Sequence, residues 1–269
     1  MNSSWTYSRA LADNQGPANT GFAGESGGAR ATSILSRSPD FGNVYGTRRH
    51  RWNTTMVYDL PFGHGREFGA NMSRFADLLV GGWRLSNVFL WQTGPFESPY
   101  FPSGQGDPSG TGSGLNGTAS GFDGGHRNQA ADRNPGTAIR PVQRTRSQWI
   151  NAGAFVCPGL PNWQPGTACT TGSGSGPVPL PIGRFGNAGV GSVVGPGTVN
   201  LSTGLSKTFR LTEGMNLRAE GTFTNVLNHT NLSDPNMNIS SPSFGLISSS
   251  IASDSGGART GQISMRLDF

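Results

Sequence analysis

One pentapeptide of the chain has the spacing of a serine nucleophile. Residues 24–28 read Gly-Glu-Ser-Gly-Gly and match the G-x-S-x-G elbow that exposes a reactive hydroxyl. The elbow also needs a preceding apolar strand, a following helix, and an acid and a histidine downstream, whereas Ser26 lies among glycines in a loop-like stretch. We interpret the match as chance and expect no enzymatic activity. A hydrolase built around Ser26 is an alternative that serine-reactive labelling would test.

The two cysteines have a spacing that suits a loop disulfide. Cys157 and Cys169 are separated by eleven residues in a stretch rich in proline and glycine. In an oxidising compartment a bridge of this size stabilises the fold by about 3 kcal/mol in the chain-entropy model. Two free thiols are the alternative that the sequence leaves open.

Neither a metal nor a cofactor has a supporting pattern. The histidines are dispersed and the aspartates of the longest loop follow no calcium-loop spacing; these residues are His50, His64, His126 and His229, and Asp107, Asp123 and Asp132. Gly189 and Gly191 lack the strand-to-helix context of a dinucleotide-binding loop. We predict no metal and no cofactor.

Composition excludes several classes of protein. The net charge of +5 comes from twenty basic residues, of which Lys207 is the one lysine, and residues 48–51 form the only dense basic run, so we expect no nucleic-acid partner. The 33% hydrophobic content, with 42 glycines and 18 prolines, predicts a loop-rich chain without a large compact core. No apolar run is long enough for a membrane-spanning helix, so any membrane contact must use strands. The amino terminus lacks the features of a secretion signal, and we expect the chain to be the downstream part of a longer one.

The carboxy-terminal residues alternate between apolar and polar side chains. Ile263, Met265, Leu267 and Phe269 share one face of a strand, and a final aromatic ring suits a membrane edge. Half-buried strands of soluble sandwiches alternate in the same way. Similar strand-like segments recur along the chain, and we predict six of them, at residues 3–11, 49–60, 83–96, 198–211, 215–227 and 259–269. A short helical pattern covers residues 71–80.

The connections between these segments alternate in length. Long irregular loops at residues 12–47, 97–195 and 228–257 alternate with short connections. Outer-membrane barrels have long extracellular loops and short periplasmic turns, and sandwiches have no reason for this order. We therefore predict an all-β fold, an antiparallel up-and-down meander of about six long strands that forms an open section of a large transmembrane β-barrel.

In that fold the side chains have distinct expected places. The membrane-facing residues of the last strand are the four named above. We expect an aromatic girdle at the strand ends, with sugar or nucleobase stacking as the lesser alternative, and charged residues toward the lumen, as cross-strand ladders or as substrate or plug contacts. The girdle residues are Trp5, Trp52, Tyr58, Trp83, Trp91 and Phe209, and the lumen residues are Arg51, Arg210, Arg218, Glu220, Arg266 and Asp268.

Several blocks in order resemble the carboxy-terminal barrel of Oar-like TonB-dependent transporters, from about residue 5 to the end. The blocks are residues 49–63 (RHRWNTTMVYDLPFG), 78–86 (LLVGGWRLS), 185–189 (FGNAG) with 195–197 (GPG), 217–220 (LRAE), 224–231 (TNVLNHTN) and the terminal Phe269.

This resemblance implies a receptor of the Gram-negative outer membrane that imports an extracellular ligand. Its barrel would have about 22 strands filled by an amino-terminal plug, with energy from the TonB system through that plug. The implied partners are outer-membrane lipid, the missing amino-terminal barrel and plug, the barrel-assembly machinery and an unidentified extracellular ligand. No plug domain is visible in these residues, and we expect the isolated chain to insert poorly and aggregate because its edge strands are unpaired. The rival is a secreted or surface-attached β-rich binding or adhesion protein, in which two apolar faces are buried against each other.

Overall fold

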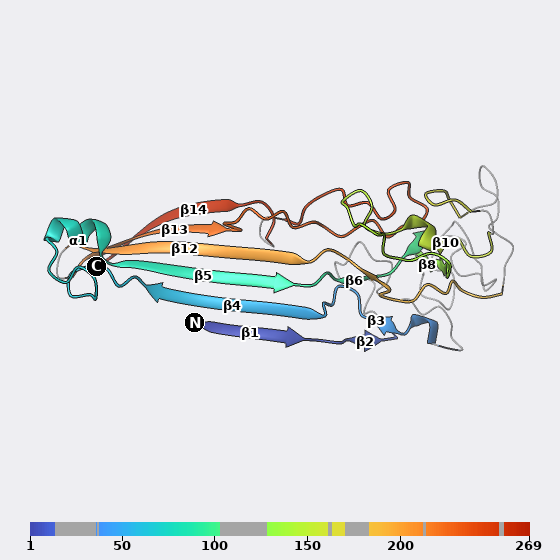
Figure 1. Ribbon diagram of the computed structural model, residues 1–269, viewed down its shortest axis with the longest axis horizontal. Coiled ribbons are helices and arrows are strands. Elements are labelled where there is room, and N and C mark those ends of the chain that lie inside the picture. Colours follow the sequence, from blue (N-terminus) through green and yellow to red (C-terminus); the bar gives the residue numbers. More distant parts are fainter. Residues whose placement is uncertain are drawn as a thin grey trace.

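The computed structural model describes residues 1–13, 36, 38–102, 128–160, 163–169, 183–211, 214–252 and 256–269. Within these residues the long strands form one six-stranded sheet in the order β1-β4-β5-β12-β13-β14, and every neighbouring pair is antiparallel. The strands are β1 (Asn2–Tyr7), β4 (His50–Asp59), β5 (Trp83–Gln92), β12 (Thr198–Arg210), β13 (Asn216–Thr224) and β14 (Thr260–Asp268). The sheet order follows the chain order, so the predicted all-β meander is confirmed (Figure 1).

Several strands end earlier than the sequence pattern predicts. The first stops at Tyr7, where its partner begins at His50, and β2 (Leu11–Ala12) pairs instead with β3 (Gly42–Asn43). The third stops at Gln92, shortly before Pro95, a residue that has no N–H to donate to a ladder. The fifth stops before Asn225, whose positive φ of 47° leaves the extended region.

One end of the sheet carries the short connections. The β4–β5 connection contains the helix α1 (Arg74–Val80), which starts later than the predicted residue 71 because Ser73 caps it by accepting from the Ala76 N–H at 3.3 Å. The β12–β13 connection is closed by a backbone bond from Leu211 to Met215 at 2.9 Å. In Figure 1 α1 and the carboxy terminus lie together at this end, on the left.

The described parts of the long connections gather at the opposite end and fold into a packed body, called the loop body below. Short strand pairs and 3-10 turns organise them: β6 (Phe96–Glu97) with β11 (Val193–Val194), β7 (Tyr100–Pro102) with β8 (Asn128–Ala130), β9 (Asp132–Arg133) with β10 (Phe155–Val156), and the turns η1 (Ser38–Asp40) and η2 (Ala152–Ala154). In the described parts of residues 97–195, which the sequence predicts to be irregular, these short pairs alternate with turns and bends. Local sequence gave no sign of this body because its short strands pair with distant segments.

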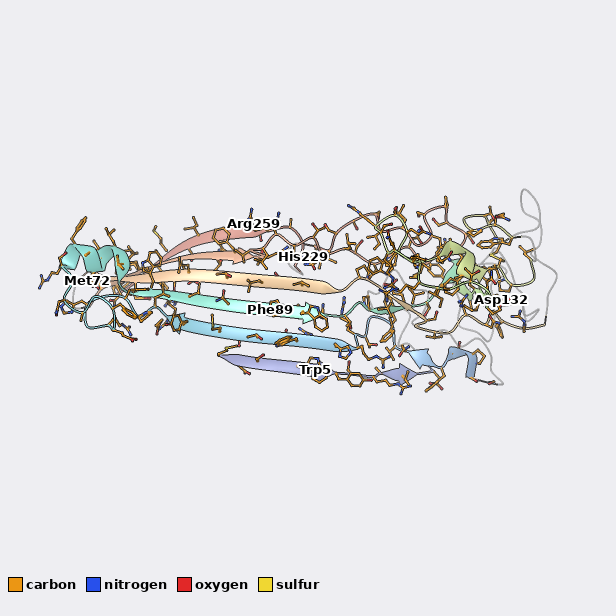
Figure 2. All side chains as sticks on the ribbon, viewed as in Figure 1. Trp5, Met72, Phe89, Asp132, His229 and Arg259 are labelled. Atoms are coloured by element: carbon orange, nitrogen blue, oxygen red, sulfur yellow. A yellow bond between two sulfur atoms is a disulfide. The ribbon has the colours of Figure 1, made fainter. Side chains whose placement is uncertain are left out.

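The principal core lies in these loops. Its buried apolar residues come from two of the long connections, at residues 97–195 and 228–257, and are Phe101, Ala131, Ile150, Ala154, Phe155, Cys157, Trp163, Cys169, Ala188, Val193, Met237, Ile239 and Phe244. In contrast, every residue of β14 is exposed. Figure 2 shows the side chains crowding at the loop end, around the labelled Asp132, and standing out from the sheet elsewhere.

Candidate functional site

The six-stranded sheet has one apolar and one polar face. The register aligns residues that face the same way across neighbouring strands, and one such row joins Tyr58, Leu85, Leu205, Gly221 and Ile263. Exposed large apolar side chains dominate this face: Trp52 is 47% exposed, Leu205 41% and Ile263 79%. A water-soluble protein does not leave such a continuous apolar surface uncovered, whereas hydrocarbon solvates it.

The aromatic residues on this face form two rows. Trp5, Trp52 and Trp91 are paired in register at the loop end of the first three strands. Tyr58, Trp83 and Phe209 lie near the α1 end. The eight residue steps from Trp83 to Trp91 extend for about 27 Å along the strand. A tilt of about 40° gives a band about 20 Å tall, close to the apolar height of an outer-membrane barrel.

Contacts hold the loop-end row in place. The Trp5 ring is stacked on His50 with centroids 5.7 Å apart, and Trp52 Nε1 donates to Ser3 Oγ at 2.8 Å. Trp52 also meets Phe89 edge to face at 6.2 Å. Fixed amphipathic rings of this kind are typical of a membrane–water boundary.

The polar face carries charges concentrated toward the α1 end. Arg218 is 2.9 Å from Glu220 and Arg266 is 2.7 Å from Asp268, so each arginine is paired on its own strand. The opposed pair Asp59 and Arg84, at 2.5 Å, adds to this group and was missed by sequence reasoning.

Two of the predicted lumen arginines do not join that group among the described side chains. Arg51 lies at the loop end of β4, opposite Gln92. Arg210 lies opposite Asn216 at the end of β12, and its side chain is outside the described part of the chain.

The loop body is fastened by the two cysteines. Cys157 and Cys169 form a disulfide with their Cα atoms 5.6 Å apart, and both are buried in the loop core. The bridge therefore closes a loop that already contributes to the core, which limits the arrangements open to its outer surface.

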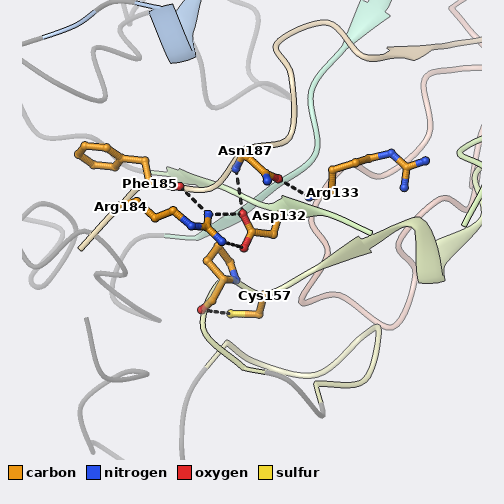
Figure 3. Close-up of polar contacts among 7 residues, drawn as sticks. Asp132, Arg133, Cys157, Arg184, Phe185 and Asn187 are labelled. Atoms are coloured by element: carbon orange, nitrogen blue, oxygen red, sulfur yellow. Dashed lines mark hydrogen bonds and ion pairs between the residues drawn. The ribbon is translucent and has the colours of Figure 1, made fainter. Parts of the chain in front are cut away.

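An ion pair joins two distant parts of the same body. Both carboxylate oxygens of Asp132 accept from the Arg184 guanidinium at 2.7 Å, and Asp132 Oδ1 also accepts from the Asn187 N–H at 2.9 Å (Figure 3). Asn187 Oδ1 accepts in turn from the Arg133 N–H at 2.7 Å. Asp132 is thus a structural anchor in the described loops, and no calcium ligand set surrounds it there.

Two buried asparagines attach the β13–β14 loop to the six-stranded sheet, which is called the wall below. Asn231 accepts from the Val199 N–H and donates to the Val199 carbonyl, both at 2.8 Å, so its amide acts as a strand partner. Asn225 donates to the carbonyls of His229 at 2.8 Å and Gly257 at 2.6 Å. These bonds give a physical reason for the TNVLNHTN block, which was noticed in the sequence only as a resemblance.

Arginine and tryptophan join further loop segments. Arg144 lies 4.7 Å from the centre of the Trp149 ring, and burial, with the nearby positive Arg140, lowers the pKa of its guanidinium. Trp149 Nε1 donates to the Val194 carbonyl at 2.9 Å.

A charged group lies where the loops meet the wall. Arg48 donates to the Thr93 carbonyl at 2.6 Å, and burial lowers its pKa against the opposing effects of Asp234 and Glu97. The carboxyl of Asp234 reaches solvent but is crowded by its surroundings, and this desolvation raises its pKa more than Arg48 and a hydrogen bond with Glu97 lower it.

The remaining candidate catalytic and metal-binding residues either lie outside the described residues or form no cluster among them. Ser26, Asp107, Asp123 and His126 lie outside the described residues. Among the residues that are described, no cluster of three or more histidines, cysteines and acids is suited to a metal. In the same part of the chain no helix combines the length and apolar character needed to cross a membrane.

Comparison with known proteins gives one match. The family model described as an outer membrane beta barrel domain matches residues 1–262. No curated protein and no solved structure matches the chain.

Proposed function

The chain belongs to the outer membrane β-barrel domain family and is a protein of the Gram-negative outer membrane, and from this premise we propose that it is part of a TonB-dependent receptor that imports an extracellular ligand. The wall would separate lipid from a polar lumen. The folded loops would recognise the ligand outside, and energy would come from the TonB system through a plug.

The observation that carries the proposal is the packed loop body on one end of the wall. A disulfide, the Asp132–Arg184 pair and the two buried asparagines hold its described parts in a defined shape. A preorganised surface of this kind is what selective binding requires, since ordering loops only on binding would cost affinity.

The resemblance to Oar-like transporters supports the same reading. Its blocks lie at structurally demanding places: residues 49–63 cover β4 and the turn after it, residues 78–86 cover the corner from α1 into β5, and residues 224–231 carry the asparagine attachments. In such a receptor the barrel-assembly machinery would insert the wall and lipid would surround it.

The rival adhesion protein is less well supported. In that protein two apolar sheet faces would be buried against each other. The long strands described here form a single sheet with its apolar side chains exposed. The proposal assigns no catalytic step, and labelling of Ser26 by a fluorophosphonate would count against it.

The test is a comparison of spent media from three strains. One lacks the gene, one lacks the TonB system and one is the parent. We expect the deletion strain to leave in the medium a compound that the parent removes, and the strain without TonB to leave the same compound. Uptake that survives loss of the TonB system would contradict the proposal.

Complementation then ties uptake to the loops. A gene carrying Asp132→Asn should restore uptake only in part, and one carrying Thr230→Ala, at an exposed loop position, should restore it fully. Outer-membrane levels of both variants must match the parent.

A further inference from the structure

The helix α1 is apolar on its outer surface although it lies outside the sheet. In its seven residues Phe75 is 73% exposed, Leu78 50%, Leu79 59% and Val80 45%. In water these side chains would leave apolar surface unburied, which is unfavourable. The helix therefore needs an apolar surrounding that the described residues of the chain do not supply.

Two bonds place the end of α1 against the membrane-facing side of the wall. Trp83 Nε1 donates to the Leu79 carbonyl at 3.0 Å, and the Lys207 ammonium donates to the Gly81 carbonyl that follows the helix. Trp83 and Lys207 are register partners on the apolar face of β5 and β12. The apolar surface of α1 is therefore continuous with the lipid-facing wall.

The surroundings of Lys207 indicate that this contact lies near the membrane boundary. It is the chain's only lysine, it is 3% exposed, and its ammonium lies 5.1 Å from the Trp83 ring centre and 5.3 Å from that of Phe209. A cation on the lipid side of a wall is tolerated near the boundary when carbonyls and aromatic rings surround it. A helix carboxy terminus is also a favourable partner for a positive charge.

A second set of contacts, around Asp77, fixes the helix at its middle. Asp77 Oδ1 accepts from the His64 N–H at 2.6 Å, and a Cβ at Gly63 or Gly81 would lie within 3 Å of that same oxygen. The turn after β4 and the end of α1 thus close around one carboxylate. The orientation of α1 is set by the wall rather than left to the short helix itself.

We propose that α1 is an interfacial foot, with Phe75, Leu78 and Leu79 inserted among the acyl chains of the phospholipid leaflet that meets this end of the wall. The exposed Arg74 of the same helix is available to lipid phosphates. The inference rests on the wall facing lipid and not on import.

The test uses spin labels on the full-length gene product in isolated outer membranes. Cysteines introduced as Phe75→Cys and Leu78→Cys are labelled, and the native cysteines stay in their disulfide. Power saturation compares collisions with oxygen, which concentrates in lipid, and with a nickel chelate, which stays in water. Ile263→Cys serves as the wall control and Val142→Cys, at a fully exposed loop position, as the water control.

We expect the oxygen-to-nickel ratio at positions 75 and 78 to match that at 263 and to exceed that at 142 several-fold. A ratio like that at 142 would overturn the inference, and so would low collision rates with both reagents, which indicate a protein partner. A water-like value at 263 would instead overturn the barrel wall itself.

Replacement of Lys207 tests whether its bond to the Gly81 carbonyl holds α1 against the wall. Lys207→Met should lower the ratio at positions 75 and 78 toward the water value while the ratio at 263 stays unchanged. Arg266→Gln, on the polar face, should change neither. If Lys207→Met leaves positions 75 and 78 at the lipid value, Lys207 does not hold the foot.

Discussion

Asp132 and Arg184 join two loop segments fifty-two residues apart through a two-pronged ion pair, with both N–O distances at 2.7 Å. The Asp132 side chain is 10% exposed and the Arg184 side chain 50%. The carboxylate is therefore held within the body while the arginine closes over it from outside. Its additional bond to the Asn187 N–H ties Asp132 a second time to the segment that carries Arg184.

Removal of this carboxylate should loosen the loops without changing the wall. Asp132→Asn loses the charge-assisted bonds, and we expect the loop body to be less stable by about 2 kcal/mol. Arg184→Lys keeps the charge but loses the fork, so its effect should be intermediate. Protease digestion of intact cells measures both, with Thr230→Ala as control. Equal resistance of parent and Asp132→Asn would contradict the anchor role.

Loss of the Asn231 side chain should detach the β13–β14 loop from β12. Asn231→Ala leaves the Val199 N–H and carbonyl and the Gly256 carbonyl without their present partner, and we expect a cost of about 3 kcal/mol. Hydrogen exchange at Val199 and at Ile251, whose N–H donates to the Asn231 carbonyl, should quicken. The two positions exchanging as in the parent would show that backbone contacts alone hold the loop.

The two faces of β14 should differ in how much stability they lose on the same substitution. Ile263→Arg places a charge on the lipid side and should cost up to about 2–4 kcal/mol, whereas Ser264→Arg, on the polar face, should cost less than about 1 kcal/mol. Urea unfolding of the membrane-inserted protein compares them. Equal costs would mean that the two faces do not meet different solvents.

The junction of loops and wall should respond to pH through Asp234. Its pKa is raised above the ordinary 3.8 because desolvation outweighs Arg48 and Glu97. Its contribution to stability is therefore full below the ordinary pKa and is lost as the pH rises through the folded pKa. Asp234→Asn should stabilise the loops at pH 7, by less than about 1 kcal/mol because the carboxyl is partly exposed, and should lose this advantage near pH 3.

Hydrogen exchange of residues 228–252, corrected for intrinsic rates, measures the effect. Thr230→Ala controls for general loop changes. A benefit of Asp234→Asn that grows as the pH falls would show the sign to be wrong.

The wall was largely predictable from sequence and the loop body was not. Alternation in β4 and β14 revealed the faces because a strand places successive side chains on opposite sides. The core contacts of Phe101, Ile150 and Phe244 join distant segments without any period, so nothing local announces them. The Asp59–Arg84 pair depends on the register of two strands, which alternation alone does not set.

The protein has two separate groups of apolar side chains. One group is buried beneath the loops, and the other is exposed on the face of the sheet that contacts lipid. The two groups of residues can therefore evolve independently. Substitutions on the outer surface of the loops need only preserve the small buried core that contains Cys157 and Cys169, while the exposed apolar residues of the sheet must stay compatible with lipid. The loop surface can therefore diverge while the six-stranded sheet stays unchanged.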